Sequence, residues 1–325
     1  MRLHENPILF RQAVQATAQS LGIQEIFVEK DYWVTYALHA IYNSQIGAET
    51  ILKGGTSLSK CFGLISRFSE DIDLVIKHSG NESGSKLKSM IRNVSVAVAN
   101  VLPEVQVEGL TIKMGINRKT AHEYPHIFTG YFGQTRNVIV LEVTRLGYFE
   151  PYFSQKVNSC IFDMMINTGQ KKIAEEYDLL PFEVQVLDPK RTICEKIMSL
   201  VRFSYSKDPI GDLQKKIRHT YDLYQLLEDS TLNDFFKSSE FEKMLLRVAR
   251  DDIDSFSDNA WLQNHPVQSL IFAELEPAWE SLKDTYNGDF RNLVYGEFPT
   301  DSMVLATLIS IRDRLKNISW EIIDE

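Results

Sequence analysis

The sequence predicts an α+β protein in which a mixed sheet with helices is followed by a mainly helical domain. Two observations lead to this prediction. Residues 105–162 alternate apolar and polar side chains and are rich in β-branched residues, a pattern typical of strands. From residue 189 onward, apolar residues recur at helical spacing instead. A chain of 325 residues is long enough for about two domains, and we place them at residues 1–187 and 188–325.

The N-terminal part is expected to form helices around two short strands. Residues 6–21 have an amphipathic pattern with Pro7 at the first turn, where proline is favoured. A second helix is expected over residues 28–43. The next expected elements are strands at 51–53 and 72–77, a loop at 78–85 and a helix at 86–102.

The remaining elements follow from the same two patterns. Four stretches are expected to form strands of one sheet: VQVEGLTIKM, HIFTGYF, NVIVLEVTRL and KVNSCIF. In the C-terminal half, helices are expected at 191–203, 213–227, 233–248, 265–284 and 301–318.

Composition narrows the class of protein. The net charge of -9 argues against a generic basic nucleic-acid-binding protein, although a local basic face can still bind RNA. Three scattered cysteines form no zinc motif and indicate reduced thiols. No apolar run approaches the roughly 20 residues of a membrane span, and the N-terminus lacks the pattern of a secretory signal. We therefore expect a cytoplasmic protein without a membrane partner.

A glycine turn lies between the two short strands. Gly54 and Gly55 allow the backbone to approach a ligand closely, and the segment after them begins a helix whose unpaired N–H groups attract anions. Thr56 and Ser57 either contact a phosphate or cap the helix, and Lys60 either holds that phosphate or faces solvent. The turn therefore predicts a phosphate-binding site, with a purely structural turn as the alternative.

Two aspartates follow at the start of the second strand. Asp71 and Asp73 are two residues apart, so their side chains point to the same face. Their neighbours are apolar, and carboxylates in such surroundings require a cation or hydrogen bonds to offset desolvation. Arg67 and Ser69 either orient these acids or reach a triphosphate. With the glycine turn, the pair predicts a magnesium–nucleotide site, and hence phosphoryl or nucleotidyl transfer; a solvated acidic face is the alternative.

A third carboxylate commonly completes a two-metal site for nucleotidyl transfer, where it holds the ion that activates the attacking hydroxyl. Glu142, in the strongly strand-forming run NVIVLEVTRL, is the best candidate for this third metal ligand. In the alternative interpretation, Glu142 pairs with Arg145 or faces water.

Polar residues of the helical half are candidates for the same site. Lys196 lies on an amphipathic helix and would reach a triphosphate as a point charge; the alternative is a solvated surface lysine. Arg218 and Asp222 lie four residues apart on one helix face, where an ordinary ion pair is the alternative role.

Together these residues resemble the AbiEii/AbiGii toxin family of the DNA polymerase beta-like nucleotidyltransferase superfamily. The resemblance covers roughly residues 28–227, and the first two motifs are highly specific in combination. The matching motifs are Gly54-Gly55-Thr56-Ser57-Leu58, Arg67-Phe68-Ser69-Glu70-Asp71-Ile72-Asp73-Leu74, Lys196 and Arg218-His219-Thr220-Tyr221-Asp222-Leu223, and the run Glu29-Lys30-Asp31-Tyr32 resembles the family's opening helix.

The resemblance implies the toxin of a bacterial toxin–antitoxin or phage-defence system. Members of the family use a nucleoside triphosphate and magnesium, so we expect magnesium in this chain, with manganese as the alternative ion. Some modify the acceptor end of transfer RNA, and the antitoxin is usually a separate protein encoded alongside. By resemblance, Asp71 and Asp73 bind the metals and Thr56 and Lys60 the triphosphate, while Lys196 and Asp222 complete the site from the helical domain.

Two other functions are compatible with parts of the sequence. An Asp-x-Asp pair also holds metal–nucleotide-sugar complexes in glycosyltransferases, although those enzymes generally place it after a larger Rossmann-like half. A non-catalytic module that binds a nucleotide or a partner protein is the other alternative. An RNA acceptor would need a local basic face, for which the candidates are Lys86, Lys88 and Arg92, or Lys215, Lys216 and Arg218.

Overall fold

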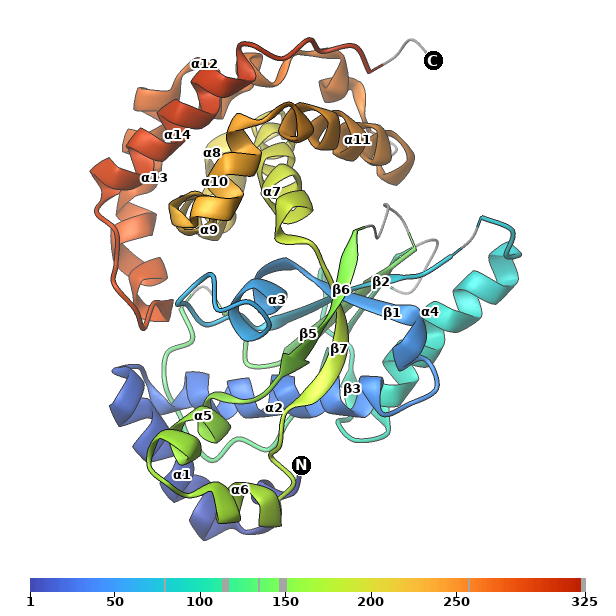
Figure 1. Cartoon of the computed structure of the whole chain (residues 1–325), viewed down its shortest axis with the longest axis vertical. Helices are drawn as coiled ribbons and strands as arrows, with labels where there is room; N and C mark the ends of the chain where they lie inside the picture. The colour runs from blue at the N-terminus through green and yellow to red at the C-terminus, as the bar shows by residue number, and fades with distance from the viewer. Residues whose placement is uncertain (79, 113–116, 134, 146–150, 257, 323–325) are drawn as a thin grey trace. The chain divides into compact units, whose positions relative to one another are not determined.

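The computed structural model describes residues 1–325 except 79, 113–116, 134, 146–150, 257 and 323–325 (Figure 1). Contacts within the chain divide it into two compact units. Unit 1 comprises Met1–Arg145, Tyr152–Leu187 and Leu293–Gly296, and unit 2 consists mainly of Asp188–Asn292 and the residues from Glu297 onward. The named strands lie in unit 1, whereas the described elements of unit 2 are helices. The predicted α+β fold class is thereby confirmed.

Unit 1 is built on a mixed sheet of seven strands in the order β3-β4-β5-β2-β1-β7-β6. Strands β1 and β2 pair antiparallel, and each has a parallel neighbour on its other side, β7 and β5 respectively. The sequence segment that carries the glycine turn and the aspartates therefore lies in the middle of the sheet. The strands are β1 Thr50–Lys53, β2 Asp71–Ile76, β3 Glu104–Val105, β4 Asn117–His122, β5 Ile139–Thr144, β6 Tyr152–Val157 and β7 Phe182–Leu187.

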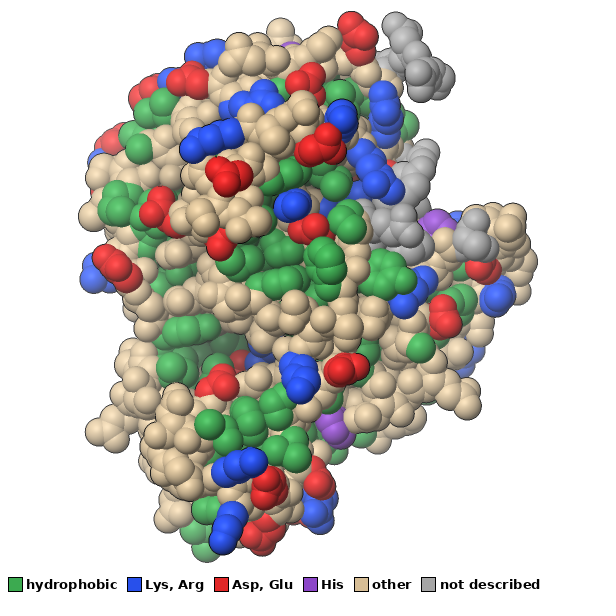
Figure 2. Space-filling model, in the orientation of Figure 1, with side chains coloured by type: hydrophobic (Ala, Val, Ile, Leu, Met, Phe, Trp, Pro, Cys, Tyr) green, Lys and Arg blue, Asp and Glu red, His purple; other side chains and the backbone are tan. Residues whose placement is uncertain are grey.

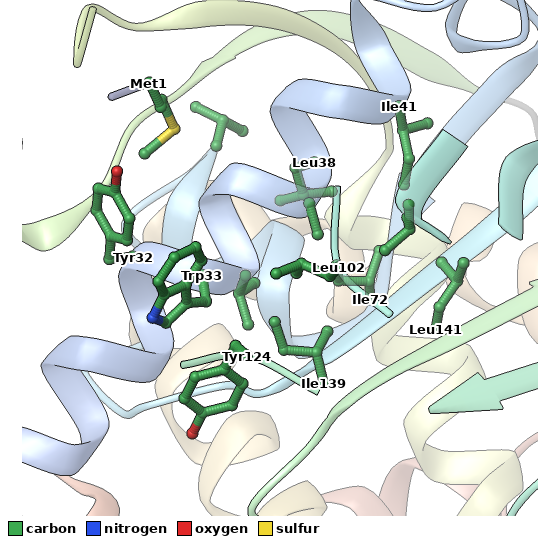
Figure 3. Packing of buried hydrophobic residues seen from close by; sticks show 14 of the residues in the cluster. Met1, Tyr32, Trp33, Leu38, Ile41, Ile72, Leu102, Tyr124, Ile139 and Leu141 are labelled. Atoms are coloured by element: carbon green, nitrogen blue, oxygen red, sulfur yellow. The ribbon is translucent and has the colours of Figure 1, made fainter. Parts of the chain in front are cut away.

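One face of this sheet is covered by helices and forms the main core of unit 1. Helices α2 (Glu25–Tyr42) and α4 (Gly84–Ala99) pack against the strands. Figure 3 shows Leu38 of α2 packed near Ile72 of β2 and Leu141 of β5, and all three side chains are buried. Because side chains alternate along a strand, the residues on either side of Ile72 point away from this core, to the opposite face.

Two of the other helices of unit 1, α1 and α5, begin after a residue whose side chain caps the helix. Helix α1 starts after Asn6, whose side chain accepts a hydrogen bond from the N–H of Leu9 at 3.2 Å, and ends at Gly22 in the left-handed conformation. The helices are α1 Pro7–Leu21, α3 Gly54–Lys60, α5 Cys160–Asn167 and α6 Lys171–Glu176, with short 3-10 turns at Leu3–Glu5 and Gly47–Glu49.

Unit 2 is helical. Its first helix, α7, is capped by Asp188, whose carboxylate accepts a hydrogen bond from the N–H of Lys190 at 2.8 Å. In the part of the chain that the structure describes, no helix is both long and apolar enough to cross a membrane. The helices are α7 Pro189–Phe203, α8 Pro209–Lys215, α9 Arg218–Glu228, α10 Ser230–Lys237, α11 Ser239–Ser255, α12 Leu270–Ala273, α13 Leu275–Thr285 and α14 Asp301–Leu315, with short turns at Ala260–Gln263, Pro266–Gln268, Tyr286–Phe290 and Arg291–Leu293.

The predicted strands between residues 105 and 162 are partly wrong. HIFTGYF is a loop, because the carboxylate of Glu29 accepts the backbone N–H groups of Ile127 and Phe128 that a strand partner would otherwise use. KVNSCIF is a strand only to Val157, since Ser159 caps helix α5. The run VQVEGLTIKM contributes to β3 and an isolated bridge, and its last two residues lie outside the described residues.

Two strands have no counterpart among the predicted ones. Strand β4, with the sequence NRKTAH, lacks apolar alternation because polar side chains lie on both of its faces. Lys119 shares the sheet face of the aspartates, whereas Arg118 points to the opposite face, toward Ser95. Strand β7, FEVQVL, does alternate but lies beyond the predicted strand region. In unit 2, the helix expected at 213–227 is two helices, α8 and α9, and the helix expected at 233–248 is interrupted at Ser238, which caps α11.

Candidate active site

Three acidic side chains meet on the sheet face opposite the main core. Asp71 and Asp73 project from the same side of β2, as their spacing predicts. Glu142 of β5 is the direct neighbour of Asp73 in the parallel register, whereas Asp71 lies opposite Val140. Neighbouring strands are about 4.8 Å apart, so the structure brings together the three carboxylates that the sequence proposes as metal ligands.

The electrostatics of this cluster depend on two lysines that were not predicted from the sequence. Burial, together with the charges of Glu142 and Asp71, raises the pKa of Asp73 to about 7. Lys53 and Lys119 act in the opposite direction on the same pKa. Lys119 Nζ donates to Glu142 Oε2 at 3.0 Å, so Glu142 pairs with a residue of β4. The cluster therefore favours a bound cation.

The donor set suits magnesium. Carboxylate oxygens are the ligands that Mg²⁺ prefers, and in nucleotide sites one or two carboxylates share the ion with substrate phosphates. Within the described ranges, no group of three Asp, Glu, His or Cys side chains is arranged to hold a metal ion by itself. Asp71 and Asp73 thus fit an ion whose coordination is completed by a nucleotide.

The glycine turn is shaped by the side chains that approach it. Gly54 has φ +75°, and a Cβ atom there would lie 2.5 Å from Asp73 Oδ2. A Cβ at Gly55 would lie 2.7 Å from Arg67 Nη2 and 2.8 Å from Ser69 Oγ. A side chain at Gly54 would therefore displace Asp73, and one at Gly55 would displace Arg67 and Ser69, so both positions favour glycine.

The hydroxyl groups that follow the glycines hold the turn in place. Thr56 Oγ1 donates to the carbonyl oxygen of Asp71 at 2.5 Å and lies 3.1 Å from Ser69 Oγ. Ser57 Oγ donates to the carbonyl oxygen of Gly54 at 2.8 Å. Both side chains are buried. The Thr56 bond connects α3 to the start of β2 and so fixes the position of Asp71, whereas the Ser57 bond lies within α3.

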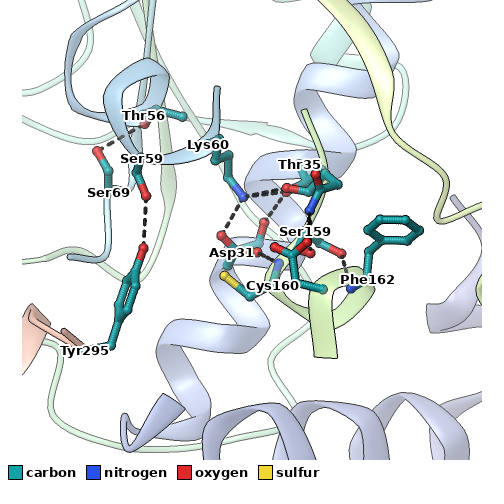
Figure 4. Close-up of polar contacts among 12 residues, drawn as sticks. Asp31, Thr35, Thr56, Ser59, Lys60, Ser69, Ser159, Cys160, Phe162 and Tyr295 are labelled. Carbon is teal, nitrogen blue, oxygen red and sulfur yellow. Dashed lines mark hydrogen bonds and ion pairs between the residues drawn. The ribbon is translucent and has the colours of Figure 1, made fainter. Parts of the chain in front are cut away.

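Lys60 is directed toward helix α2 (Figure 4). Its ammonium group donates to Asp31 Oδ1 at 2.5 Å, to Thr35 Oγ1 at 2.9 Å and to the carbonyl oxygen of Asn158 at 3.3 Å. Lys60 and Asp31 are almost fully buried. The structure thus places Lys60 in an ion pair with Asp31 that anchors α3, and not beside Asp71 and Asp73.

A buried network behind the aspartates was not predicted from the sequence. Lys30 of α2 pairs with Glu70, and neither side chain is exposed to solvent. Glu70 also accepts the backbone N–H of Arg136 at 2.8 Å, and Lys30 donates to the carbonyl oxygen of Arg136 at 2.5 Å. The Arg136 guanidinium, 46% exposed, reaches within 4.0 Å of Asp71 Oδ1. The run Glu29-Lys30-Asp31 was the available signal, because three consecutive charges on a buried helix each require a partner.

A short segment from late in the chain covers Arg67. Leu293–Gly296 belongs to unit 1, where Val294 forms a bridge with Arg67 and Tyr295 Oη lies 3.1 Å from Ser59 Oγ (Figure 4). A cavity of about 10 Å³ remains between this segment and helix α2. This volume is at the lower limit for a single water molecule, so the cavity does not hold substrate.

In unit 2, the predicted residues Lys196 and Asp222 lie together. Lys196 Nζ of α7 is 2.7 Å from Asp222 Oδ2 of α9, and their side chains are 5% and 0% exposed. His219 Nδ1 lies 3.3 Å from the same ammonium group. Lys196 is therefore not a solvated surface lysine. Arg218, the first residue of α9, is half-buried.

The basic residues proposed for RNA binding lie on helices of both units. On the face shown in Figure 2, lysine and arginine side chains are interspersed with aspartate and glutamate. Lys86, Lys88 and Arg92 are exposed on α4, whereas Lys215 forms an ion pair with Asp212 at 2.7 Å. The Lys215 side chain nevertheless stays 73% exposed, so both candidate sets reach solvent.

Comparisons with known proteins connect this geometry to a family. The family described as the nucleotidyl transferase AbiEii toxin of type IV toxin–antitoxin systems matches residues 36–311. Among solved structures, MenT4, a nucleotidyltransferase toxin from Mycobacterium tuberculosis, is similar with a TM-score of 0.51 and 15% sequence identity, over 96% of this chain and 94% of that chain. At this identity the likeness concerns the fold. A search of curated proteins found no match.

Proposed function

The chain belongs to the family of AbiEii nucleotidyltransferase toxins of type IV toxin–antitoxin systems, and we propose that it uses Mg²⁺ to transfer a nucleoside monophosphate from a nucleoside triphosphate to an acceptor hydroxyl. The family implies a nucleoside triphosphate substrate and an antitoxin partner. One observation carries the proposal: Asp71 and Asp73 share a sheet face, and the backbone of Gly54 passes directly against Asp73.

In this proposal the residues of unit 1 bind the metal–triphosphate complex. Asp71 and Asp73 hold Mg²⁺, or Mn²⁺ in its place, and Glu142 adds a third carboxylate beside Asp73. The backbone of the glycine turn faces the phosphates, and Thr56 and Ser57 keep that turn in shape. The remaining residues support them: Arg67 and Ser69 pack against Gly55, and Lys60 anchors α3 through Asp31.

The proposed reaction is an in-line displacement at the α-phosphorus. The acceptor oxygen forms a bond to the α-phosphorus, and the bond from that phosphorus to its bridging oxygen breaks. Pyrophosphate leaves with the electron pair, and the hydroxyl proton passes to water. When bound, the metal neutralises charge on the phosphates. The contribution of the protein is to position the reactants and to stabilise charge.

We propose that Lys196, Asp222 and Arg218 take part from unit 2. A lysine buried to 5% exposure is unusual unless its charge is used or paired, and the carboxylate of Asp222, 2.7 Å away, orients its ammonium group. An ammonium in this setting is suited to binding a triphosphate as a point charge. Lys196→Met is therefore expected to raise the KM for the nucleoside triphosphate and to lower kcat.

We propose transfer RNA as the acceptor and the cytoplasm, where transfer RNA and nucleoside triphosphates occur, as the site of action. The exposed residues Lys86, Lys88 and Arg92 of α4 support an electrostatic contact with RNA phosphates. The affinity for transfer RNA is then expected to fall as salt rises, with a smaller slope when these three residues are replaced by glutamine. An affinity that does not change with salt would contradict this contact.

The test of the proposed function is a transfer assay. Purified protein is incubated with Mg²⁺, labelled nucleoside triphosphates and total RNA, alongside Asp73→Asn and Asp178→Asn. Asp178 is an exposed surface residue paired with Arg2, so its variant is the matched control. We expect label in RNA with the wild type and the control but not with Asp73→Asn. If neither RNA nor protein gains label, or if only sugar nucleotides serve as donors, the proposal fails.

A further inference from the structure

Four charged residues lie side by side across the sheet face that carries the aspartates. Lys53 of β1 is opposite Asp73 of β2, Asp73 is opposite Glu142 of β5, and Glu142 is opposite Lys119 of β4. Residues directly opposite one another in a sheet have Cβ atoms about 5 Å apart on the same face. The charges along this row are therefore positive, negative, negative and positive.

The outer carboxylate of this row already has a cation. Lys119 Nζ donates to Glu142 Oε2 at 3.0 Å, and only 27% of the Lys119 side chain is exposed. The lysine is held there by the strand itself, because β4 and β5 stay in register from Asn117↔Thr144 to His122↔Ile139. Asp71 lies opposite the apolar Val140 on β5, and Arg136 Nη1 lies 4.0 Å from its Oδ1 atom.

A two-metal site would require a second divalent ion at the third carboxylate. That ion would have to share Glu142 with the ammonium group of Lys119, and two positive centres on one carboxylate repel each other over a distance too short for salt to screen. Mg²⁺ also loses its water ligands reluctantly. Lys119 therefore competes with a second ion for Glu142.

We propose that the ammonium group of Lys119 takes the place of a second divalent ion at Glu142. The protein then binds one divalent ion, at Asp71 and Asp73, rather than two. This inference rests on the proposed function. It changes the role that the sequence predicts for Glu142, which here is a partner of Lys119 and not the ligand of a second metal. The pair would present a fixed cation beside Asp73 whether or not a nucleotide is bound.

The experiment counts Mn²⁺ ions by electron paramagnetic resonance and equilibrium dialysis on the full chain, with and without a non-hydrolysable nucleoside triphosphate. The Mn²⁺ bound by the nucleotide in the absence of protein is measured separately and subtracted from the count. The wild type is expected to bind one ion, Lys119→Met two, and Lys119→Arg one. Adding Glu142→Gln to Lys119→Met should return the count to one. The matched control is Arg118→Met, which removes a cation of the same strand that faces the other way, toward Ser95.

The outcomes separate this inference from the proposed function. Two ions in the wild type, or one ion in a folded Lys119→Met, would overturn the inference and leave the nucleotidyl transfer proposal in place. No ion in the wild type, even with nucleotide, would overturn both. If Lys119→Met does not fold, as judged by its thermal transition, the count in Lys119→Arg and in Glu142→Gln decides: each must bind one ion.

Discussion

Replacing Gly54 by alanine tests whether the turn exists to seat Asp73. Gly54 has φ +75°, a left-handed conformation that is roughly 1–2 kcal/mol less favourable for alanine than for glycine. The added Cβ would also lie 2.5 Å from Asp73 Oδ2. To reach an ordinary contact of 3.4 Å, the carboxylate must move by about 0.9 Å. A misplacement of about 1 Å in a catalytic group lowers the rate about 100-fold.

The chain contains a matched control for the backbone strain. Gly22, at the end of α1, has φ +68°, and a Cβ there would meet nothing within 4 Å. Gly22→Ala and Gly54→Ala should therefore lose similar stability in urea unfolding, about 1–2 kcal/mol. Only Gly54→Ala should lose about 100-fold in kcat/KM for nucleotide transfer, which corresponds to about 2.7 kcal/mol of transition-state stabilisation.

Two results would refute this reasoning. If Gly54→Ala keeps an activity within threefold of Gly22→Ala, the contact with Asp73 has no catalytic importance. If Gly54→Ala unfolds at much lower urea concentrations than Gly22→Ala, the glycine is required for packing rather than for the site. Mn²⁺ affinity, measured on both variants, provides an independent readout and should fall only in Gly54→Ala.

Three further predictions concern the charges around the aspartates. Lys30→Met removes the buried ammonium group that pairs with Glu70 and should lower the free energy of unfolding by about 3–5 kcal/mol in urea, whereas the double variant with Glu70→Leu should recover much of this loss. Asp73 has a folded-state pKa of about 7, above its ordinary value of 3.8, so the metal-free protein should lose stability as pH rises from about 4 to 7. Asp73→Asn should therefore have a higher melting temperature than the wild type at pH 8 and nearly the same melting temperature at pH 4. Equal melting temperatures at pH 8 would contradict the raised pKa. Arg136→Ala should raise the KM for the nucleoside triphosphate about tenfold with little change in melting temperature, because the backbone bonds of Arg136 to the buried pair are kept and its guanidinium, 46% exposed, approaches Glu70 only to 3.7 Å. An unchanged KM would remove Arg136 from the site.

The parts of the site that could be predicted from the sequence are local. Asp71 and Asp73 could be placed on one face because side chains alternate along a strand with a period of two residues. The turn could be predicted because glycine allows backbone conformations that other residues avoid. Both properties can be recognised within a few residues. Glu142 was found because a strongly strand-forming run surrounds it. The family resemblance was confirmed by the match over residues 36–311.

The parts that could not be predicted depend on packing between distant segments. Lys30 and Glu70 are 40 residues apart, and nothing near either one indicates that they meet. Lys119 lies on a strand without apolar alternation, so neither the strand nor its pairing with Glu142 follows from the local pattern. Lys60 has the spacing of a phosphate ligand after the turn, but the buried carboxylate of Asp31 binds its ammonium group instead.

A crystal of the full chain soaked with Mn²⁺ and a non-hydrolysable nucleoside triphosphate tests the central claim most directly. The anomalous signal of manganese locates the metal independently of any assumption about the site. We expect a peak in contact with the carboxylates of both Asp71 and Asp73, with the triphosphate along the turn at Gly54 and Gly55. A peak and a triphosphate bound elsewhere, with the two aspartates free of metal, would contradict the account.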